Sequence, residues 1–253
     1  NFMGKALDFG VQSYCFRNFK DNKDVAKKVK EIGVNSIELC GVHANFNDIA
    51  GWKDVVKIYQ DAGISIVSIG VQTFKGNDTE RDWFECLKIS GAKHISAHFT
   101  IDTYQTAIPK TVKLADEFDV RVGIHLHGGY QFGGSPDVVN HLMALGGNRI
   151  GINIDTAWCM QIGPYRGNPV DWVKKNPNRI YGVHYKDFTF EPNGKWNDVI
   201  VGTGSLNLPA FVSALEEANF DGMAVIEYEA NPENPVPALK ECVNKMRELT
   251  VSV

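Results

Sequence analysis

The sequence has few cysteines, lacks a long apolar run, and is not dominated by charge of either sign. Its five cysteines are odd in number and widely scattered, and none forms a C-x-x-C pair. This pattern argues against a disulfide framework and against a zinc knuckle, so we expect a reducing compartment. The most apolar stretch, residues 64–71, is far shorter than the ~20 residues that cross a bilayer. Since no basic-then-apolar leader opens the sequence, we expect a soluble cytoplasmic protein without a membrane partner.

The charge balance excludes a further class of partner. The 26 Lys and Arg residues and the 30 Asp and Glu residues give a formal net charge of −4, and the sequence contains no run of like charges. Proteins that follow a phosphate backbone usually present a basic face, so nucleic acid is not expected to bind. With 43% hydrophobic and 22% charged residues, the chain has the composition of a globular protein with a sizeable core.

Short apolar runs alternate with longer amphipathic segments along the whole chain. Several amphipathic segments begin at Asp or Pro and end at Gly, as helices often do. Gly33, Gly63 and Gly91 each stand between such a segment and the next apolar run, where a positive φ is favoured. The runs predict strands at residues 7–14, 34–40, 64–70, 92–98, 120–127, 149–155, 180–186 and 223–229. Helices are predicted at residues 24–32, 52–62, 79–90, 108–118, 136–144, 170–175, 208–218 and 236–249.

Eight β-α units in 253 residues indicate the α/β class and a single (β/α)8 TIM barrel. A doubly wound open sheet usually has fewer strands and a glycine-rich first turn, and no G-x-G-x-x-G follows the first predicted strand. The sequence contains no linker or low-complexity tract, and only the loop 188–204 is long enough to be an insertion. We therefore predict one TIM-barrel domain over residues 1–253.

Polar residues share one parity along the predicted strands. Side chains alternate along a strand, and in a barrel one of the two sets enters the interior. The inward polar residues gather toward the carboxyl ends of the strands, where barrel enzymes carry their active sites. The residues predicted to point inward are Ser36, Glu38, Cys40, His94, Ser96, His98, Arg121, Gly123, His125, His127, Asn153, Asp155, His184, Lys186, Glu227 and Glu229.

His125, Asp155, His184 and Glu227 end four consecutive predicted strands, which suggests a shared divalent metal ion. Burying such groups without partners costs several kcal/mol each, and a cation would satisfy all four. Two imidazoles and two carboxylates suit Mn²⁺, Zn²⁺ or Co²⁺ better than Mg²⁺ or Ca²⁺. The alternative is a network of ion pairs without a metal. A cation here would stabilise an enediolate formed beside a carbonyl, and sugars carry the required pair of oxygens.

Six segments at or after the predicted strands form a set: SIELC at 36–40, NID at 153–155, NPVDW at 168–172, NRIYGVHYKD at 178–187, GTGS at 202–205 and VIEYE at 225–229. Together they resemble the xylose isomerase-like (endonuclease IV-like) TIM barrels of the sugar-phosphate isomerase/epimerase superfamily, over essentially the whole chain. The resemblance implies a metal held by Glu, Asp, His and Glu on strands five to eight. Asp155, His184 and Glu227 match the last three positions, whereas His125 replaces the first Glu. The family's Asp-x-x-His also differs, because Trp158 occupies its last position.

The resemblance implies a metal-dependent sugar isomerase or epimerase. Epimerases of the family are thought to use two metal-bound glutamates on opposite faces of the substrate. Because His125 replaces one of them, we expect Glu227 to be the single carboxylate base and His127 or His98 to handle the other proton. This arrangement fits aldose–ketose isomerisation, or β-elimination beside a carbonyl. A 3-keto-glycoside lyase or hydrolase is therefore the alternative, and a non-catalytic sugar-binding barrel is a third interpretation.

Four further residues complete the predicted site. Lys186 is expected to neutralise an enediolate or bind a substrate hydroxyl, with an ion pair to Asp187 or Glu227 as the alternative. Glu38 is expected to bond sugar hydroxyls at the barrel mouth, and Tyr14 and Trp158 are expected to contact the substrate, with ordinary packing as the alternative. The expected partner is a small carbohydrate, whereas the sugar and any homo-oligomer stay open. A DNA-repair nuclease of the superfamily would need three metals and a basic groove, which the acidic composition disfavours.

Overall fold

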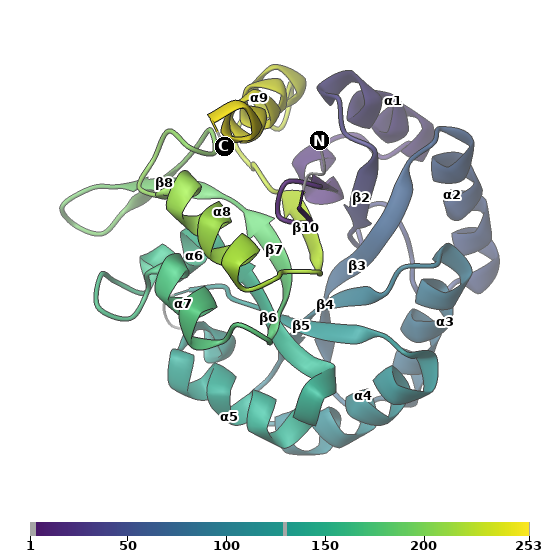
Figure 1. Ribbon diagram of the computed structural model, residues 1–253. Coiled ribbons are helices and arrows are strands. Elements are labelled where there is room, and N and C mark those ends of the chain that lie inside the picture. Colours follow the sequence, from purple (N-terminus) through teal and green to yellow (C-terminus); the bar gives the residue numbers. More distant parts are fainter. Residues whose placement is uncertain (1–3, 129–130, 253) are drawn as a thin grey trace.

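The computed structural model describes residues 4–128 and 131–252. Eight parallel strands form a closed barrel in the order β1-β10-β7-β6-β5-β4-β3-β2, and helices surround it (Figure 1). Each barrel strand therefore pairs with the barrel strand next to it in sequence, and the last pairs with the first. The predicted (β/α)8 barrel is confirmed. None of the helices in the described part of the chain is both long and apolar enough to span a membrane.

The barrel strands are shorter than the apolar runs that predicted them, except for β3. The structure ends β5 at His125, so the prediction that His127 belongs to this strand is wrong. His127 lies beyond the strand, directly before Gly128, whose φ is 60°. The strands are β1 Gly10–Gln12, β2 Ser36–Leu39, β3 Ser65–Phe74, β4 His94–Phe99, β5 Arg121–His125, β6 Ile150–Asp155, β7 Ile180–Tyr185 and β10 Met223–Ile226.

The helices begin and end close to the predicted positions, except for the short helix at Thr156–Gln161, which was not predicted. The Asp21 carboxylate accepts the Lys23 N–H and starts α1, while Gly33 (φ 86°) and Gly91 (φ 79°) end α1 and α3 in the left-handed conformation. The helices are α1 Asn22–Ile32, α2 Ile49–Asp61, α3 Arg81–Ser90, α4 Tyr104–Phe118, α5 Pro136–Gly146, α6 Thr156–Gln161, α7 Pro169–Lys175, α8 Leu208–Glu217 and α9 Val236–Ser252. Short 3-10 helices lie at Ser13–Phe16, Asp78–Glu80, Phe132–Gly134 and Gly147–Arg149.

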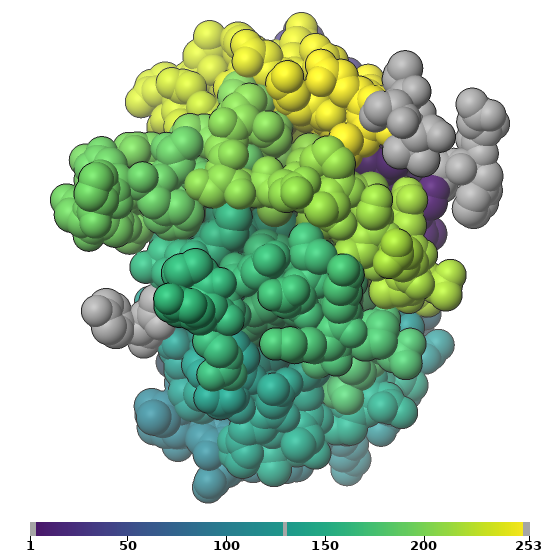
Figure 2. All heavy atoms as spheres, turned by 60° about the vertical axis from the view of Figure 1, so that its left-hand side comes forward, coloured from purple at the N-terminus to yellow at the C-terminus, as the bar shows by residue number. Residues whose placement is uncertain are grey.

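An antiparallel hairpin interrupts the alternation of strands and helices after β7. Strands β8 (Asp187–Phe190) and β9 (Trp196–Val199) pair with each other and form a separate two-stranded sheet. The sequence predicted this segment only as a long loop. The green hairpin protrudes beyond the body of the barrel in Figure 2, so it adds a structural element beside the carboxyl ends of the strands.

The barrel separates an apolar layer from a polar interior. The outward side chains Val122, Ile124 and Ile152 are buried against the helices, as the parity of the strands predicts. Inside the barrel, Gly123 on β5 leaves room for the His94 ring, because a side chain there would collide with it. The interior of the barrel therefore has room for polar side chains that reach from one strand toward the strands opposite.

Candidate metal centre

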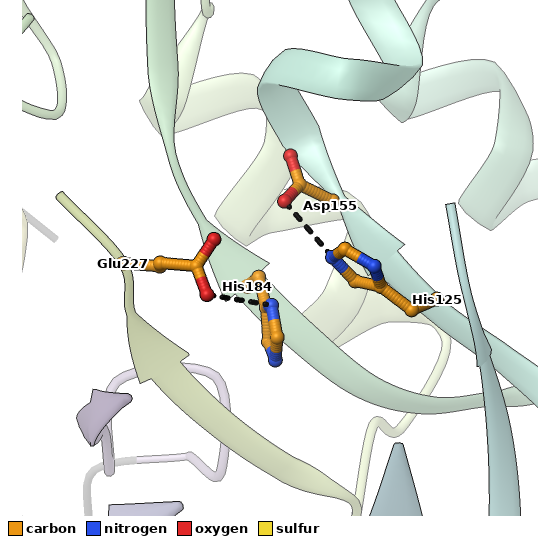
Figure 3. A group of neighbouring side chains, drawn as sticks. All are labelled: His125, Asp155, His184 and Glu227. Atoms are coloured by element: carbon orange, nitrogen blue, oxygen red, sulfur yellow. Dashed lines mark hydrogen bonds and ion pairs between the residues drawn. The ribbon is translucent and has the colours of Figure 1, made fainter. Parts of the chain in front are cut away.

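Four buried side chains converge at the carboxyl ends of four neighbouring barrel strands. His125 and Asp155 are the last residues of β5 and β6, His184 lies near the end of β7, and Glu227 follows β10. One ligand atom from each residue lies within 4.8 Å of those from the others (Figure 3). The structure thus brings together all four residues that the sequence predicts as metal ligands.

Two separations within this quartet are close to those of ligands that share an ion. His125 Nε2 lies 3.2 Å from Asp155 Oδ2, and His184 Nδ1 lies 3.7 Å from Glu227 Oε2 (Figure 3). Two atoms that are each about 2.1 Å from a common cation lie roughly 3–3.5 Å apart. His184 Nδ1 is buried and has no hydrogen-bond partner among the described residues. An imidazole nitrogen that is buried beside a carboxylate, with no other partner, suits a cation.

Glu38 holds the opposite edge of the His184 ring. Its Oε1 lies 2.6 Å from His184 Nε2 and 2.7 Å from the Gln12 amide nitrogen, and its Oε2 accepts from Ser68 (2.5 Å) and Ser96 (2.6 Å). A carboxylate only accepts hydrogen bonds, so His184 Nε2 carries a hydrogen, and Nδ1 is the nitrogen that would lose its proton and bind a cation in the quartet. Ligating histidines commonly donate their second nitrogen to a carboxylate in this way.

The position of Glu38 differs from the prediction that it bonds sugar hydroxyls at the barrel mouth. It has no exposed surface, and four side-chain donors occupy its two oxygens. The alternation of side chains along β2 correctly predicts that Glu38 points into the barrel, but it does not indicate how far below the barrel mouth the side chain lies. Burial alone would raise the pKa of the Glu38 carboxyl, but the charge and the hydrogen bond of His184 lower it well below its usual value. Glu38 is thus an ionised support beneath His184.

Burial and charge shift the pKa values of the quartet in opposite directions. Burial raises the pKa of Glu227 to about 7, although His184 and Lys186 oppose the rise. Burial also raises the pKa of Asp155. The pKa of His184 rises to about 9, because Glu38 outweighs the effect of burial, whereas burial lowers the pKa of His125. Carboxyl groups that are costly to ionise in the folded protein would be stabilised as carboxylates by a cation.

Lys186 lies in an ion-pair network next to the quartet. Its Nζ is 2.6 Å from Glu229 Oε2 and 3.1 Å from Asp198 Oδ2, and it lies 3.8 Å from Glu227 Oε1. The side chain is buried, and these carboxylates outweigh the effect of burial and raise its pKa above the usual value. Lys186 is therefore ion-paired, but chiefly with Glu229 and Asp198. Of the two partners predicted for it, Glu227 lies farther away, and Asp187 instead accepts backbone N–H groups. Asp198, on β9, was missed because its segment was expected to be a loop.

The other predicted site residues border the quartet or lie apart from it. The His98 ring is 5.3 Å from that of His125, and burial lowers the pKa of His98 to about 3. The His127 ring stacks on Trp158 with the centroids 4.6 Å apart. Tyr14 lies in the 3-10 helix after β1, half-exposed and covered by the Arg17 guanidinium. Contact of these residues with a substrate stays a prediction.

Comparison with known proteins places these observations in a family context. A sequence model of the family described as xylose isomerase-like TIM barrel matches residues 26–249. The chain matches no functionally curated protein.

Several solved structures share the fold of this chain. One is 3-keto-D-glucoside 4-epimerase from E. coli, with a TM-score of 0.73 and 16% identity over 97% of this chain and 100% of that chain. D-allulose 3-epimerase from Methylomonas sp. gives a TM-score of 0.74 and 12% identity over 98% and 100%. A xylose isomerase-like TIM barrel protein from Mycobacterium smegmatis in complex with magnesium gives 0.76 and 12% over 98% and 97%. At these identities the likeness establishes the fold.

Proposed function

Because the chain belongs to the family of xylose isomerase-like TIM barrels, we propose that it is a divalent-metal-dependent sugar isomerase or epimerase. The observation that carries the proposal is the quartet of His125, Asp155, His184 and Glu227 at the carboxyl ends of the strands. Two of the structural neighbours are sugar epimerases by name, which supports this class of reaction.

The quartet would hold one cation, through imidazole nitrogens of His125 and His184 and carboxylate oxygens of Asp155 and Glu227. This donor set favours Mn²⁺, Zn²⁺ or Co²⁺. When bound, the cation supplies positive charge that polarises a sugar carbonyl and its neighbouring hydroxyl. Glu38 keeps His184 in the tautomer that can bind, since its carboxylate accepts the Nε2 hydrogen.

Glu227 would remove the C–H proton beside the carbonyl and give an enediolate. The cation would keep Glu227 ionised although it is buried, so its carboxylate would be able to accept this proton. The Lys186 ammonium, 3.8 Å from Glu227 Oε1, would position that carboxylate. His98 would be neutral at physiological pH because its pKa is low, and it or His127 would accept a hydroxyl proton on the other side of the substrate.

Cleavage of a 3-keto-glycoside is the second candidate reaction for the same site. It begins with the same proton abstraction beside a carbonyl and then expels the group on the neighbouring carbon. Two observations favour it. The histidines His98 and His127 lie beside His125, so an imidazole that has accepted a hydroxyl proton would be able to pass it to a leaving group. One neighbour acts by name on a 3-keto-D-glucoside.

The decisive experiment is incubation of the protein, loaded separately with Mn²⁺, Zn²⁺ and Co²⁺, with ketoses, aldoses and 3-keto-glycosides in D₂O. Deuterium at carbon without bond cleavage is expected for an isomerase or epimerase, whereas release of the aglycone would indicate the lyase. Glu227→Gln should abolish either reaction. Glu80→Gln is the matched control, because Glu80 is a buried glutamate that bonds the backbone ahead of α3. Sugar binding without exchange would refute the enzyme and support a binding barrel.

A further inference from the structure

The hairpin after β7 carries three of its aromatic residues on one face. In the antiparallel register, Phe188 lies opposite Asp198 and Phe190 lies opposite Trp196. Side chains alternate along each strand, and directly opposed residues project to the same side. These four side chains therefore share a face. Because Asp198 on this face bonds Lys186 at 3.1 Å, the face is turned toward the quartet.

The aromatic rings of this face continue into the barrel mouth through Trp158. The Trp158 ring meets those of Phe188 and Trp196 edge-on, with the centroids 5.0 and 5.1 Å apart. Its own ring stacks on His127 at 4.6 Å. Phe188 and Trp196 are nearly parallel, with centroids 6.1 Å apart. A continuous series of rings thus leads from His127 to the hairpin.

The inner end of this series adjoins the candidate metal centre. The backbone N–H of Trp158 donates to Asp155 Oδ1 at 2.9 Å, while Asp155 Oδ2 faces His125. The His127 and His125 rings have centroids 5.7 Å apart. The aromatic series therefore begins within one ring of the quartet.

The outer end of the series is open to solvent. Phe188 is 1% exposed, but Phe190 and Trp196 are 37% and 43% exposed. Single exposed aromatic residues are ordinary on protein surfaces, whereas a directly opposed pair beside a polar site is a suitable place for an apolar ring. Burying either ring against a ligand would remove apolar surface from water.

The hairpin is held in place by hydrogen bonds at both strands. The Asp187 carboxylate accepts the backbone N–H groups of Gly202, Gly204 and Leu206 at 2.9–3.0 Å. On the other strand, Asp198 Oδ2 accepts from the Glu229 N–H at 2.9 Å as well as from Lys186. The aromatic face is consequently preorganised, which reduces the entropy lost when a ligand binds.

We propose that Trp158, Phe190 and Trp196 form a second subsite, which binds the apolar face of a ring attached to the reacting sugar. The substrate of the proposed reaction is then a glycoside rather than a free monosaccharide. This inference rests on the proposed function only for the placement of the reacting sugar at the quartet. The occupant is a ring with an apolar face, either an aromatic aglycone or the C–H face of a second sugar.

Calorimetric titration of the wild-type protein with phenyl β-D-glucopyranoside, methyl β-D-glucopyranoside and cellobiose tests the subsite. Phenyl and methyl glucoside have no free carbonyl group, and cellobiose is used as its methyl β-glycoside so that it has no reducing end, so binding is measured without turnover. Phenyl glucoside or cellobiose is expected to bind about tenfold more tightly than methyl glucoside. Trp196→Ala should remove the difference, and Trp196→Phe should retain most of it. A larger gain for phenyl glucoside identifies an aromatic aglycone, and a larger gain for cellobiose identifies a second sugar.

Tyr165→Ala is the matched control, because Tyr165 is 94% exposed in the loop after α6. It should behave as wild type. Equal affinity of the wild type for all three glycosides, or no binding of any of them, would overturn the subsite. A Trp196→Ala protein that keeps the preference would also overturn the subsite. The same holds if this variant loses affinity for methyl glucoside as much as for the other two glycosides. If the preference holds while no deuterium exchange occurs with any substrate, the proposed reaction fails and the subsite stands.

Discussion

Replacement of Glu38 by glutamine tests how the interior of the barrel supports the metal centre. The four side chains that bond Glu38 all act as donors toward it, two at each oxygen. The amide nitrogen of glutamine would face either the Gln12 amide and His184 Nε2, or two serine hydroxyls. Those serines already accept from His94 and Asn153. The first orientation sets donors against donors, and the second requires both serine hydroxyls to turn their hydrogens away and accept a second hydrogen bond.

The expected magnitude follows from these contacts. A hydrogen bond to a charged group contributes about 1.5–3 kcal/mol, so loss of at least one should lower the free energy of unfolding by about 2–3 kcal/mol. Loss of the carboxylate also removes the group that fixes the His184 tautomer. Changes to such supporting carboxylates lower metal affinity by roughly 10–100-fold. We therefore expect Glu38→Gln to weaken Mn²⁺ or Zn²⁺ binding by that factor.

The assay pairs urea unfolding with competition for the metal against a chelating dye. Glu80→Gln is again the control, because the Glu80 carboxylate is 3% exposed and accepts three backbone N–H bonds from Lys75, Gly76 and Asn77. It should lose comparable stability and keep the wild-type metal affinity. If Glu38→Gln binds metal as tightly as Glu80→Gln does, the role assigned to Glu38 is refuted.

Three further predictions concern the metal, the interior histidine and the buried lysine. A cation present at 100 times its Kd adds about 2.7 kcal/mol to the free energy of unfolding, so its removal by a chelator should lower Tm by roughly 5–10 °C. An unchanged Tm in a thermal scan would contradict the metal centre. Burial lowers the pKa of His94 to about 4, below the 6.5 of an unperturbed histidine. The unfolded state therefore binds more protons between these values, and about 3 kcal/mol of stability should be lost as pH falls from about 6.5 to 4. His94→Gln should flatten that dependence in urea unfolding, and an unchanged slope would count against it. Lys186→Met should cost about 3–5 kcal/mol, because it leaves buried carboxylates uncompensated. Asp198→Asn added to it should restore part of the loss, and strictly additive effects in the double-mutant cycle would argue against the network.

The sequence was sufficient to predict the barrel and the quartet. The alternation of apolar and polar residues predicts each strand from its own sequence, without knowledge of the strands beside it. The carboxyl ends of parallel strands then meet at one end of a barrel. His125, Asp155, His184 and Glu227 could therefore be grouped without knowledge of their distances. Depth and hydrogen bonding were not accessible in this way, since Glu38 has the same parity whether it lies at the mouth or beneath His184.

The hairpin was missed although the sequence contained a signal for it. Asn193 and Gly194, with φ 86° at Gly194, form a dipeptide typical of tight hairpin turns. The flanking segments have an alternating pattern, but each strand is only four residues long, so their periodicity is weak. Helix α6 was missed for the same reason. Its six residues are too few to show a helical repeat, and its first turn depends on the carboxylate of Asp155.

The Glu38 cluster joins distant parts of the chain across the barrel. Gln12, Ser68 and Ser96 come from the first half of the barrel, whereas His184 comes from β7 in the second. A fragment that ended after β4 would retain the carboxylate and its neutral donors but lose its cationic imidazole. A second half taken from another barrel would therefore leave the buried Glu38 carboxylate without its cationic partner, unless that half supplied a basic group at the position of His184.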